Sequence, residues 1–277
     1  ALSANTTGAS NVAVGYLALE DNTTGTNNVA IGKDSLRTNI TSNGNVAVGS
    51  NSLELNTAAN NTAVGNAALA ANTTGTSNVA VGALALDANT TGDNNTAVGK
   101  SALTANTTAD NNTAVGQNAL NANTTGGDNV AVGLSALDAN TTASNNTAVG
   151  YASLTANTTG ASNVATGMYA LLSNTTASNN TANGYLALRY NTTGHSNTAV
   201  GGYALDANTE GLRNTAVNAG GGVTNGDDNV MIGEAAGNHS VATTTGNQNT
   251  LIGVQTRADG ASSGQTVAIG YDVAGTG

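Results

Sequence analysis

The feature of this sequence that most constrains its fold is a short phrase that returns at a fixed interval. Aligned on the asparagine of N-[VT]-A-[VI]-G, successive copies begin 17 residues apart, with one interval of 16 between Asn45 and Asn61. A fixed period this short predicts a solenoid, in which each copy is one coil that stacks on its neighbours. The regular copies begin at Asn11, Asn28, Asn45, Asn61, Asn78, Asn95, Asn112, Asn129, Asn146, Asn163, Asn180, Asn197 and Asn214.

The length of the repeat selects the kind of solenoid. The consensus is N-[VT]-A-[VI]-G-x-x-[AS]-L-x-x-N-T-T-[GA]-x-x, and its positions are numbered here from 1 to 17. Helical repeats need about 33 to 45 residues, so one copy is too short for a helix pair but long enough for a flattened coil of two short strands and two turns. The sequence therefore predicts an all-β parallel β-solenoid (β-roll or β-helix) of about sixteen coils. Residues 1–213 are expected to form the regular part and residues 214–277 less regular coils of the same solenoid, because later copies begin 15, 20 and 17 residues apart.

The residue types assign an expected place to each repeat position. Positions 2 to 4 alternate and carry β-branched side chains, as a strand does. The glycine at position 5 suits a corner with positive φ, and Asn-Thr-Thr-Gly suits the opposite corner. A second short segment runs through positions 8 to 11. The leucine at position 9 and the valine or isoleucine at position 4 are expected in the core, position 2 at its edge, and the alanine at position 3 on the outer face.

Identical residues lie above one another when identical coils stack about 4.8 Å apart. Asparagines at positions 1 and 12 are therefore expected to form side-chain hydrogen-bonded ladders. Examples of the expected ladders and of the leucine row are Asn78, Asn95 and Asn112, then Asn89, Asn106 and Asn123, then Leu86, Leu103 and Leu120.

Composition excludes several classes of function. The formal net charge is −10, with only six Lys and Arg, so phosphate-neutralising patches for nucleic acid are missing. No apolar run approaches the roughly 18 residues of a membrane span, so membrane insertion is not expected. There is no cysteine for a thiolate metal site or a disulfide. These features are compatible with an extracellular location.

At N-[VT]-A-[VI]-G-x-x-[AS] the sequence resembles two groups of fibrous proteins. One is the head of trimeric autotransporter adhesins, whose similar string is N-S-V-A-I-G and whose three chains pack side by side as β-rolls. The other, closer in wording, is the repeat region of phage tail-fibre-like proteins, with "NTTGxxNTAIGxxAL" phrases ahead of a C-terminal self-cleaving chaperone domain. The resemblance implies a β-solenoid and an expected homo-oligomer.

Chemistry-bearing residues are sparse, and no catalytic or metal site is predicted. His195 and His239 lie far apart in the array, outside any ligand-spaced motif, and are interpreted as turn residues. Calcium binding at acidic corners is conceivable, but the spacing does not match known Asp-rich coil motifs, so solvated carboxylates are favoured. The acidic residues in question are Asp93, Asp110, Asp128, Asp227 and Asp228. We expect no cofactor and no enzymatic activity.

The Asn-Thr-Thr triplets are formal N-glycosylation acceptors. Glycans on every rung of a ladder spaced about 4.8 Å apart would collide, and turn chemistry alone explains the motif. The triplets begin at Asn5, Asn22, Asn72, Asn89, Asn106, Asn123, Asn140, Asn157, Asn174 and Asn191.

The repeats around residues 166–203 depart from the consensus sequence. Position 4 becomes Thr166 and Asn183 in two adjacent coils, and large side chains gather around them. Aromatic, arginine and methionine enrichment is typical of recognition surfaces, although drift in a tolerant array would also produce it. The candidate partner-binding patch is Met168, Tyr169, Tyr185, Arg189, Tyr190, His195 and Tyr203.

The sequence thus predicts a structural protein: the shaft of an extracellular fibre or filament, such as a phage tail fibre or a cell-surface or secreted filament. Its expected partner is itself. Burial of the outward alanine stripe and the resemblance favour a side-by-side trimer. Neither end shows a polar cap, which favours an end-to-end filament or a fragment of a longer protein. The alternatives are an adhesin head that binds a receptor or glycan through the aromatic patch and, less favoured, an ice-binding protein that uses its stacked threonines.

Overall fold

The computed structural model describes residues 1–237, 245–258, 260, 262 and 264–275. Over that part of the chain the regular elements are short strands joined by turns, and no helix is present. Two compact units can be distinguished by their internal contacts, Ala1–Thr142 and Ala143–Gly277.

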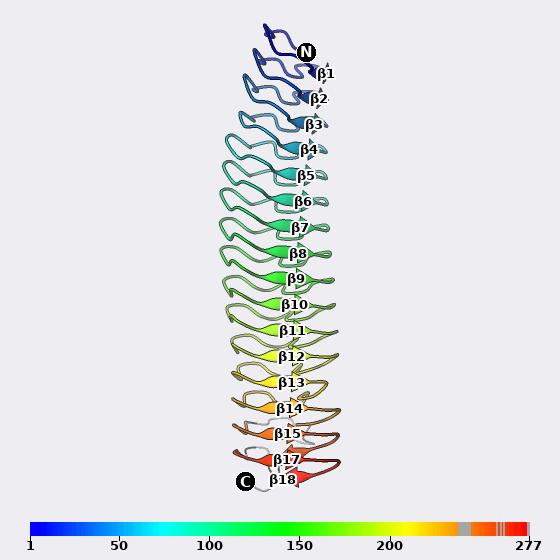
Figure 1. The fold of residues 1–277 in the computed structure, drawn as a ribbon, viewed down its shortest axis with the longest axis vertical. Coiled ribbons are helices and arrows are strands. Elements are labelled where there is room, and N and C mark those ends of the chain that lie inside the picture. Colours follow the sequence, from blue (N-terminus) through cyan, green and yellow to red (C-terminus); the bar gives the residue numbers. More distant parts are fainter. Residues whose placement is uncertain (238–244, 259, 261, 263, 276–277) are drawn as a thin grey trace. The chain divides into compact units, whose positions relative to one another are not determined.

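The first unit contains one three-residue strand per repeat. Each strand pairs in parallel with the next, and the register advances by one repeat, so that Val79 lies beside Thr96 and Ala80 beside Ala97 (Figure 1). The strands are β1 (Val12–Val14), β2 (Val29–Ile31), β3 (Val46–Val48), β4 (Thr62–Val64), β5 (Val79–Val81), β6 (Thr96–Val98), β7 (Thr113–Val115) and β8 (Val130–Val132).

The second unit continues the same pattern. Strands β9 to β15 and then β17 pair in parallel in that order, and β16 pairs with β18 in a separate two-stranded sheet. The strands are β9 (Thr147–Val149), β10 (Val164–Thr166), β11 (Thr181–Asn183), β12 (Thr198–Val200), β13 (Thr215–Val217), β14 (Val230–Ile232), β15 (Thr250–Ile252), β16 (Arg257–Ala258), β17 (Val267–Ile269) and β18 (Ala274–Gly275). The predicted all-β parallel β-solenoid with a 17-residue repeat is confirmed.

The strand faces are the reverse of those expected. The position 3 alanines, such as Ala97 and Ala114, are completely buried, whereas Val79 and Val115 at positions 2 and 4 are each 36% exposed. The alternation of residue types along a strand shows that the strand has two different faces, but it does not show which face points to the core. The leucines already fill the interior, so the strand wall has room only for a methyl group. The prediction of an outward alanine stripe and an inward position 4 was therefore wrong.

The position 9 leucines fill the centre of the coil. Leu86, Leu103 and Leu120 have no exposed surface, and together with the alanines they make up most of the apolar core. The segment around them is a series of turns rather than the second strand that the sequence suggested. Leu103 has a left-handed φ of 53°. That conformation is unusual for leucine and persists only where the surrounding structure imposes it.

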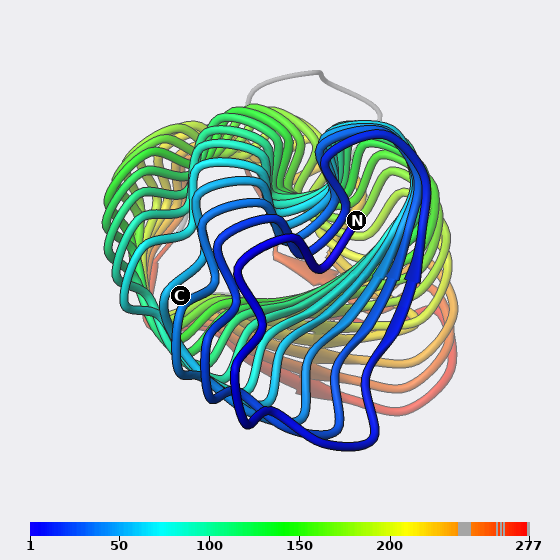
Figure 2. The same cartoon turned by 90° about the horizontal axis from the view of Figure 1, so that it is seen from above.

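The glycine at position 5 turns the strand out of the sheet at a tight corner. Gly99 has a φ of 137°, and a Cβ atom placed on it would lie 2.5 Å from the carbonyl oxygen of Gly116 in the next coil. Backbone stacks directly on backbone at this corner. Successive coils therefore have the same outline within each unit, each turned slightly relative to the one before (Figure 2).

The position 12 asparagines form a buried side-chain ladder. Asn106 Nδ2 donates to Asn89 Oδ1 at 2.8 Å and to the Ala109 carbonyl at 3.1 Å, and Asn106 Oδ1 accepts from Asn123 Nδ2 at 3.1 Å. Each rung thus joins two coils and also closes its own turn. Asn106 and its neighbours are completely buried, so these bonds satisfy amides that have no access to water.

The position 1 asparagines bond mainly to the backbone. Asn78 Oδ1 accepts from the backbone N–H of Asn95 at 2.9 Å, and Asn78 Nδ2 donates to the Gly92 carbonyl at 2.8 Å. Asn95 repeats both contacts with Asn112 and Ala109. This row therefore fastens the start of each strand to the next coil mainly through main-chain atoms. The expected side-chain pairs occur at some steps, as where Asn129 Nδ2 donates to Asn112 Oδ1 at 3.1 Å.

The single 16-residue repeat interrupts the position 12 ladder. The missing residue falls in the turn after Asn56, and Asn56 Nδ2 donates to the Ala58 carbonyl at 2.7 Å. The buried Asn39 Oδ1 consequently has no hydrogen-bond partner among the described residues. A buried acceptor without a donor is destabilising. The step between Asn39 and Asn56 is a weak point in a row that is otherwise continuous in the first unit.

Candidate functional surfaces

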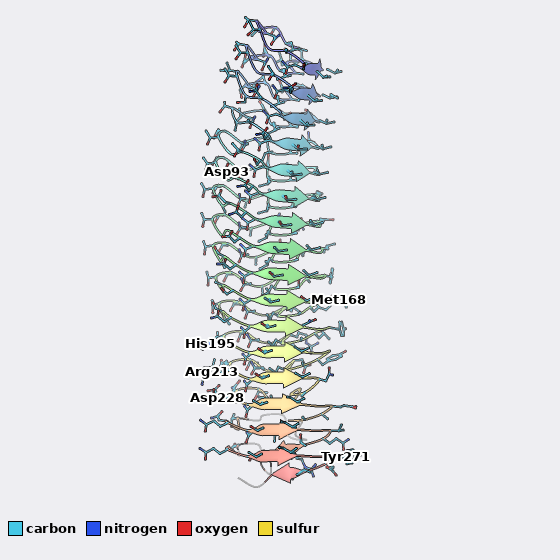
Figure 3. All side chains as sticks on the ribbon, in the orientation of Figure 1. Asp93, Met168, His195, Arg213, Asp228 and Tyr271 are labelled. Carbon is cyan, nitrogen blue, oxygen red and sulfur yellow. The ribbon has the colours of Figure 1, made fainter. Side chains whose placement is uncertain are left out.

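An aromatic strip runs along the corner that follows strands β9 to β12. Tyr151 and Tyr185 stand directly after the corner glycines, at position 6, and Tyr169 and Tyr203 stand one residue later. Met168 occupies position 6 in the coil between those of Tyr151 and Tyr185, and Figure 3 shows it at the edge of the sheet beyond the end of β10. In the first unit the same position holds a mixture that includes Lys33, Ser50, Asn66, Ala83 and Gln117.

The four tyrosines pack as two edge-to-face pairs. The ring centroids of Tyr151 and Tyr169 are 5.2 Å apart at 77°, and those of Tyr185 and Tyr203 are 5.4 Å apart at 85°. The hydrogen bond between the Tyr169 and Tyr151 side chains raises the pKa of Tyr169, with a smaller contribution from Tyr185. Partial desolvation and the neighbouring Tyr185 raise the pKa of Tyr203. The two pairs follow one another on four consecutive coils, and together they form the aromatic strip.

A charged cluster lies on the same two coils as the Tyr185–Tyr203 pair. The Arg189 guanidinium lies 4.0 Å from the centroid of the Tyr190 ring, and Arg189 Nη2 lies 3.6 Å from Asp206 Oδ2. The backbone N–H of Asp206 donates to the Tyr203 carbonyl at 3.2 Å, which places the ion pair next to that residue. Arg189 Nε is buried and makes no hydrogen bond to any residue that the structure describes. The cluster therefore combines a cation, an anion and two aromatic rings with no net charge.

A cavity of about 190 Å³ opens beside Tyr203. Its other walls are small or polar: Gly202, Asn218, Ala219, Gly221 and Ala235. Asn218 stands where other coils have the corner glycine and takes a φ of 50°. Its coil is two residues shorter than the consensus, which leaves this space at the corner.

Four of the seven residues of the predicted patch, Met168, Tyr169, Tyr185 and Tyr203, fall along this corner. Arg189 and Tyr190 stand at positions 10 and 11 of the same coil as Tyr185. His195 lies at the opposite corner of the coil, as Figure 3 shows, where its Nδ1 is 3.2 Å from Ser196 Oγ. His239 lies outside the described residues. The prediction omitted Tyr151 and Asp206. The position of Tyr151, one repeat before Met168, would have identified it.

The two polar substitutions at position 4 are explained by the orientation of the strand. Thr166 and Asn183 lie beside each other in β10 and β11, on the outer face. Polar side chains there are solvated, so these residues mark no break in the core.

The acidic corner residues serve mainly as hydrogen-bond acceptors for the neighbouring coil. Asp93 Oδ1 accepts from the backbone N–H of Thr76 at 2.6 Å, and Asp110 Oδ1 accepts from that of Asp93 at 2.7 Å. Elsewhere Asn43 or Ser178 provides the acceptor at this position. A carboxylate at this position therefore accepts the same hydrogen bond that a neutral side chain accepts in other coils.

The remaining acidic corners make similar contacts. Asp128 Oδ1 accepts from Asn111 Nδ2 at 3.1 Å, and Asp227 Oδ1 accepts from the backbone N–H of Leu212 at 2.8 Å. Asp228 accepts two hydrogen bonds from Arg213, at 2.6 and 2.8 Å, which lower the pKa of its carboxyl. Within the described part of the chain, no group of three His, Asp or Glu side chains is arranged to hold a metal ion.

The formal glycosylation acceptors are rungs of the buried ladder. Asn89 and Asn106 have no exposed surface, and their Nδ2 atoms are engaged in hydrogen bonds. Asn5 is the exposed exception, and its Nδ2 donates to the Gly8 carbonyl. A glycan on the Nδ2 of a buried rung is incompatible with the folded coil.

The outer face of the strands is a second candidate surface. In the first unit every residue at positions 2 and 4 is Val, Ile or Thr, and several are more than a third exposed. No repeat carries a charged residue at either position. The result is a sheet face of β-branched side chains in parallel register, without the charges that usually protect exposed sheets from association.

The fold defines the chain as a β-solenoid repeat protein. No protein-family model matches its sequence, and no curated protein sequence does so either. The part of the chain described by the structure contains no helix long and apolar enough to span a membrane.

Proposed function

We propose that this chain is a structural protein that forms the shaft of an extracellular fibre or filament, and that it acts mechanically rather than as an enzyme. The observation that carries the proposal is the density of bonds between coils. Coils are joined by strand pairing, by the corner backbone and, in most of the regular repeats, by two rows of asparagine side chains. Nearly every feature that recurs from repeat to repeat contributes to stacking, which is what a rigid rod requires.

The outer strand face is the surface through which chains associate in this proposal. The first unit alone presents sixteen β-branched side chains there, two from each of its eight strands. A second copy of the same chain offers a matching uncharged face at the same spacing, so lateral packing buries both. The resemblance to trimeric heads favours three chains. The face that packs is the valine and threonine face rather than the alanine stripe expected from the sequence.

Sedimentation analysis and electron microscopy test the proposal. The wild-type protein is expected to form particles larger than one 26.8 kDa chain, either side-by-side bundles or end-to-end filaments. The double variant Val79→Lys/Val130→Lys places two charges on the outer strand face and is expected to release single chains. The matched control, Thr74→Lys/Thr125→Lys, adds the same charges at exposed turn positions and leaves the assembly intact. A wild-type protein that sediments only as a monomer would contradict lateral association.

The ice-binding alternative is supported by a different row of threonines from the one first considered. Turn threonines are already occupied, since Thr90 Oγ1 donates to the Thr107 carbonyl at 3.0 Å. Thr96 and Thr113, by contrast, point outward from adjacent strands on the sheet face. Valines interrupt this row, so we favour the structural role. A thermal hysteresis measurement separates the two, because a fibre shaft lowers the freezing point no more than any solute.

A further inference from the structure

We propose that the corner of β9 to β12 is a binding site for a neutral carbohydrate chain, which lies along the strip of Tyr151, Tyr169, Tyr185 and Tyr203 and enters the cavity beside Tyr203. The proposal goes beyond the structural role and does not depend on lateral assembly. The strip follows the glycine corner, whereas the association surface is the strand face itself.

The concentration of aromatic rings is the first observation. Four of the seven tyrosines occupy this corner within four consecutive coils, and Tyr203 and Tyr185 are 52% and 43% exposed. The solenoid does not need them there, because the equivalent residues of the first unit include lysine, serine, asparagine, alanine and glutamine. Tyrosine provides an apolar face and a hydroxyl at low entropic cost, and sugars likewise combine apolar C–H faces with hydroxyl edges.

Polar groups are placed to bind hydroxyls at one end of the strip. Asp206 supplies carboxylate oxygens, Arg189 supplies a guanidinium with a buried Nε that lacks a protein partner among the described residues, and Asn218 lines the cavity. Recognition sites of this kind combine a mostly apolar lining with a few fixed donors and acceptors. Within the cavity the Asn218 amide offers a sugar hydroxyl both a donor and an acceptor, and Asp206 and Arg189 lie outside the cavity on the neighbouring coils.

Shape and charge select the ligand class. The strip is only one or two side chains wide but four coils long, which suits an extended polymer, whereas a stable protein interface buries about 800 Å² on each partner. The cavity of about 190 Å³ admits a small ring rather than a folded surface. Arg189 and Asp206 cancel each other, and a chain with net charge −10 repels polyanions. Neutral sugars meet all three conditions.

Affinity electrophoresis in gels containing dextran, a soluble β-glucan, a galactomannan or the anionic polymer alginate tests the proposal. We expect at least one neutral polysaccharide to retard the wild-type protein. Tyr185→Ala/Tyr203→Ala is expected to weaken that binding about tenfold or more, since removing a stacked ring costs on the order of 1.4 kcal/mol, a factor of ten. Asp206→Asn is expected to weaken it as well, through lost acceptor strength.

Tyr16→Ala is the matched control, because Tyr16 is 68% exposed at the same repeat position as Tyr185 but lies in the first unit. It should retain full binding, and circular dichroism should show all variants folded. The proposal is overturned if no neutral polysaccharide retards the wild type, if only alginate does, or if the tyrosine double variant binds as well as the wild type. Unchanged sedimentation of the double variant separates this site from the assembly surface.

Discussion

Removing one rung of the asparagine ladder is the most direct test of how the solenoid is held together. In Asn106→Ala, Asn89 Oδ1, the Ala109 carbonyl and Asn123 Nδ2 each lose a hydrogen bond that is present in the folded protein. All of this occurs at a site with no solvent access. A buried polar group left without a partner costs about 1 to 3 kcal/mol. Allowing for relaxation and for entry of water, we expect Asn106→Ala to lower the free energy of unfolding by about 3 kcal/mol.

The assay is urea unfolding followed by circular dichroism, combined with amide hydrogen exchange to locate the weakened coils. Exchange matters because repeat arrays can unfold in parts, and a single transition is then not guaranteed. Asn66→Ala is the matched control: the side chain is exposed and makes one long contact of 3.5 Å, so the change should be within about 0.5 kcal/mol.

Asn39→Ala provides an internal comparison, since its Oδ1 already lacks a partner and only the bonds of Nδ2 to Asn22 and Ser42 are lost. Its cost should fall below that of Asn106→Ala. If Asn106→Ala is no more destabilising than Asn66→Ala, the ladder contributes little and the reasoning fails.

Three further predictions follow from the strand faces, the short repeat and the carboxylates. Ala114→Leu should overpack the interior and cost about 1 to 3 kcal/mol, whereas Val115→Thr on the outer face should change stability by less than about 0.5 kcal/mol. Thermal unfolding that ranks them the other way would restore the original assignment of faces. Inserting one threonine after Thr57 restores the 17-residue spacing and a donor for Asn39, and should raise stability by about 1 kcal/mol. A lower urea midpoint would show that the turn, not the ladder, sets the spacing. Partial burial raises the pKa of Asp87 above its unfolded value, so its stabilising contribution is present at low pH and is lost as pH rises through the folded pKa. Asp87→Asn should therefore be the more stable protein at pH 7, by less than about 1 kcal/mol, with the difference vanishing in acid.

Sequence alone was sufficient to predict the period, the parallel stacking and the strand, because each is written as a repeated pattern. It was insufficient to place Ala114 inside and Val115 outside. Alternation is symmetric between the two faces, and the usual preference for larger apolar residues in the core gave the wrong answer. What decides the matter is volume: Leu103 and its row occupy the centre, and only alanine fits opposite.

The turn conformation around the leucines was equally hidden. Leu103 adopts a positive φ that is disfavoured for leucine, so no residue pattern within one repeat predicts it. The aromatic strip was found in part because tyrosines are rare here. Its boundary was missed because His195 is close to Arg189 in the chain but lies at the opposite corner of the coil.

The direction of the bonds between coils has a mechanical consequence. Within each unit the strand pairs and both asparagine rows connect one coil to the next along the stacking direction. Tension applied along that direction loads the coils in series, so they should detach one at a time rather than together. Each detached 17-residue coil would lengthen the chain by roughly 50 Å, its extended length less one layer of the stack. Within the regular 17-residue repeats a fibre built this way lengthens under overload in steps of equal size, and in the first unit the earliest step is expected where Asn39 lacks its partner.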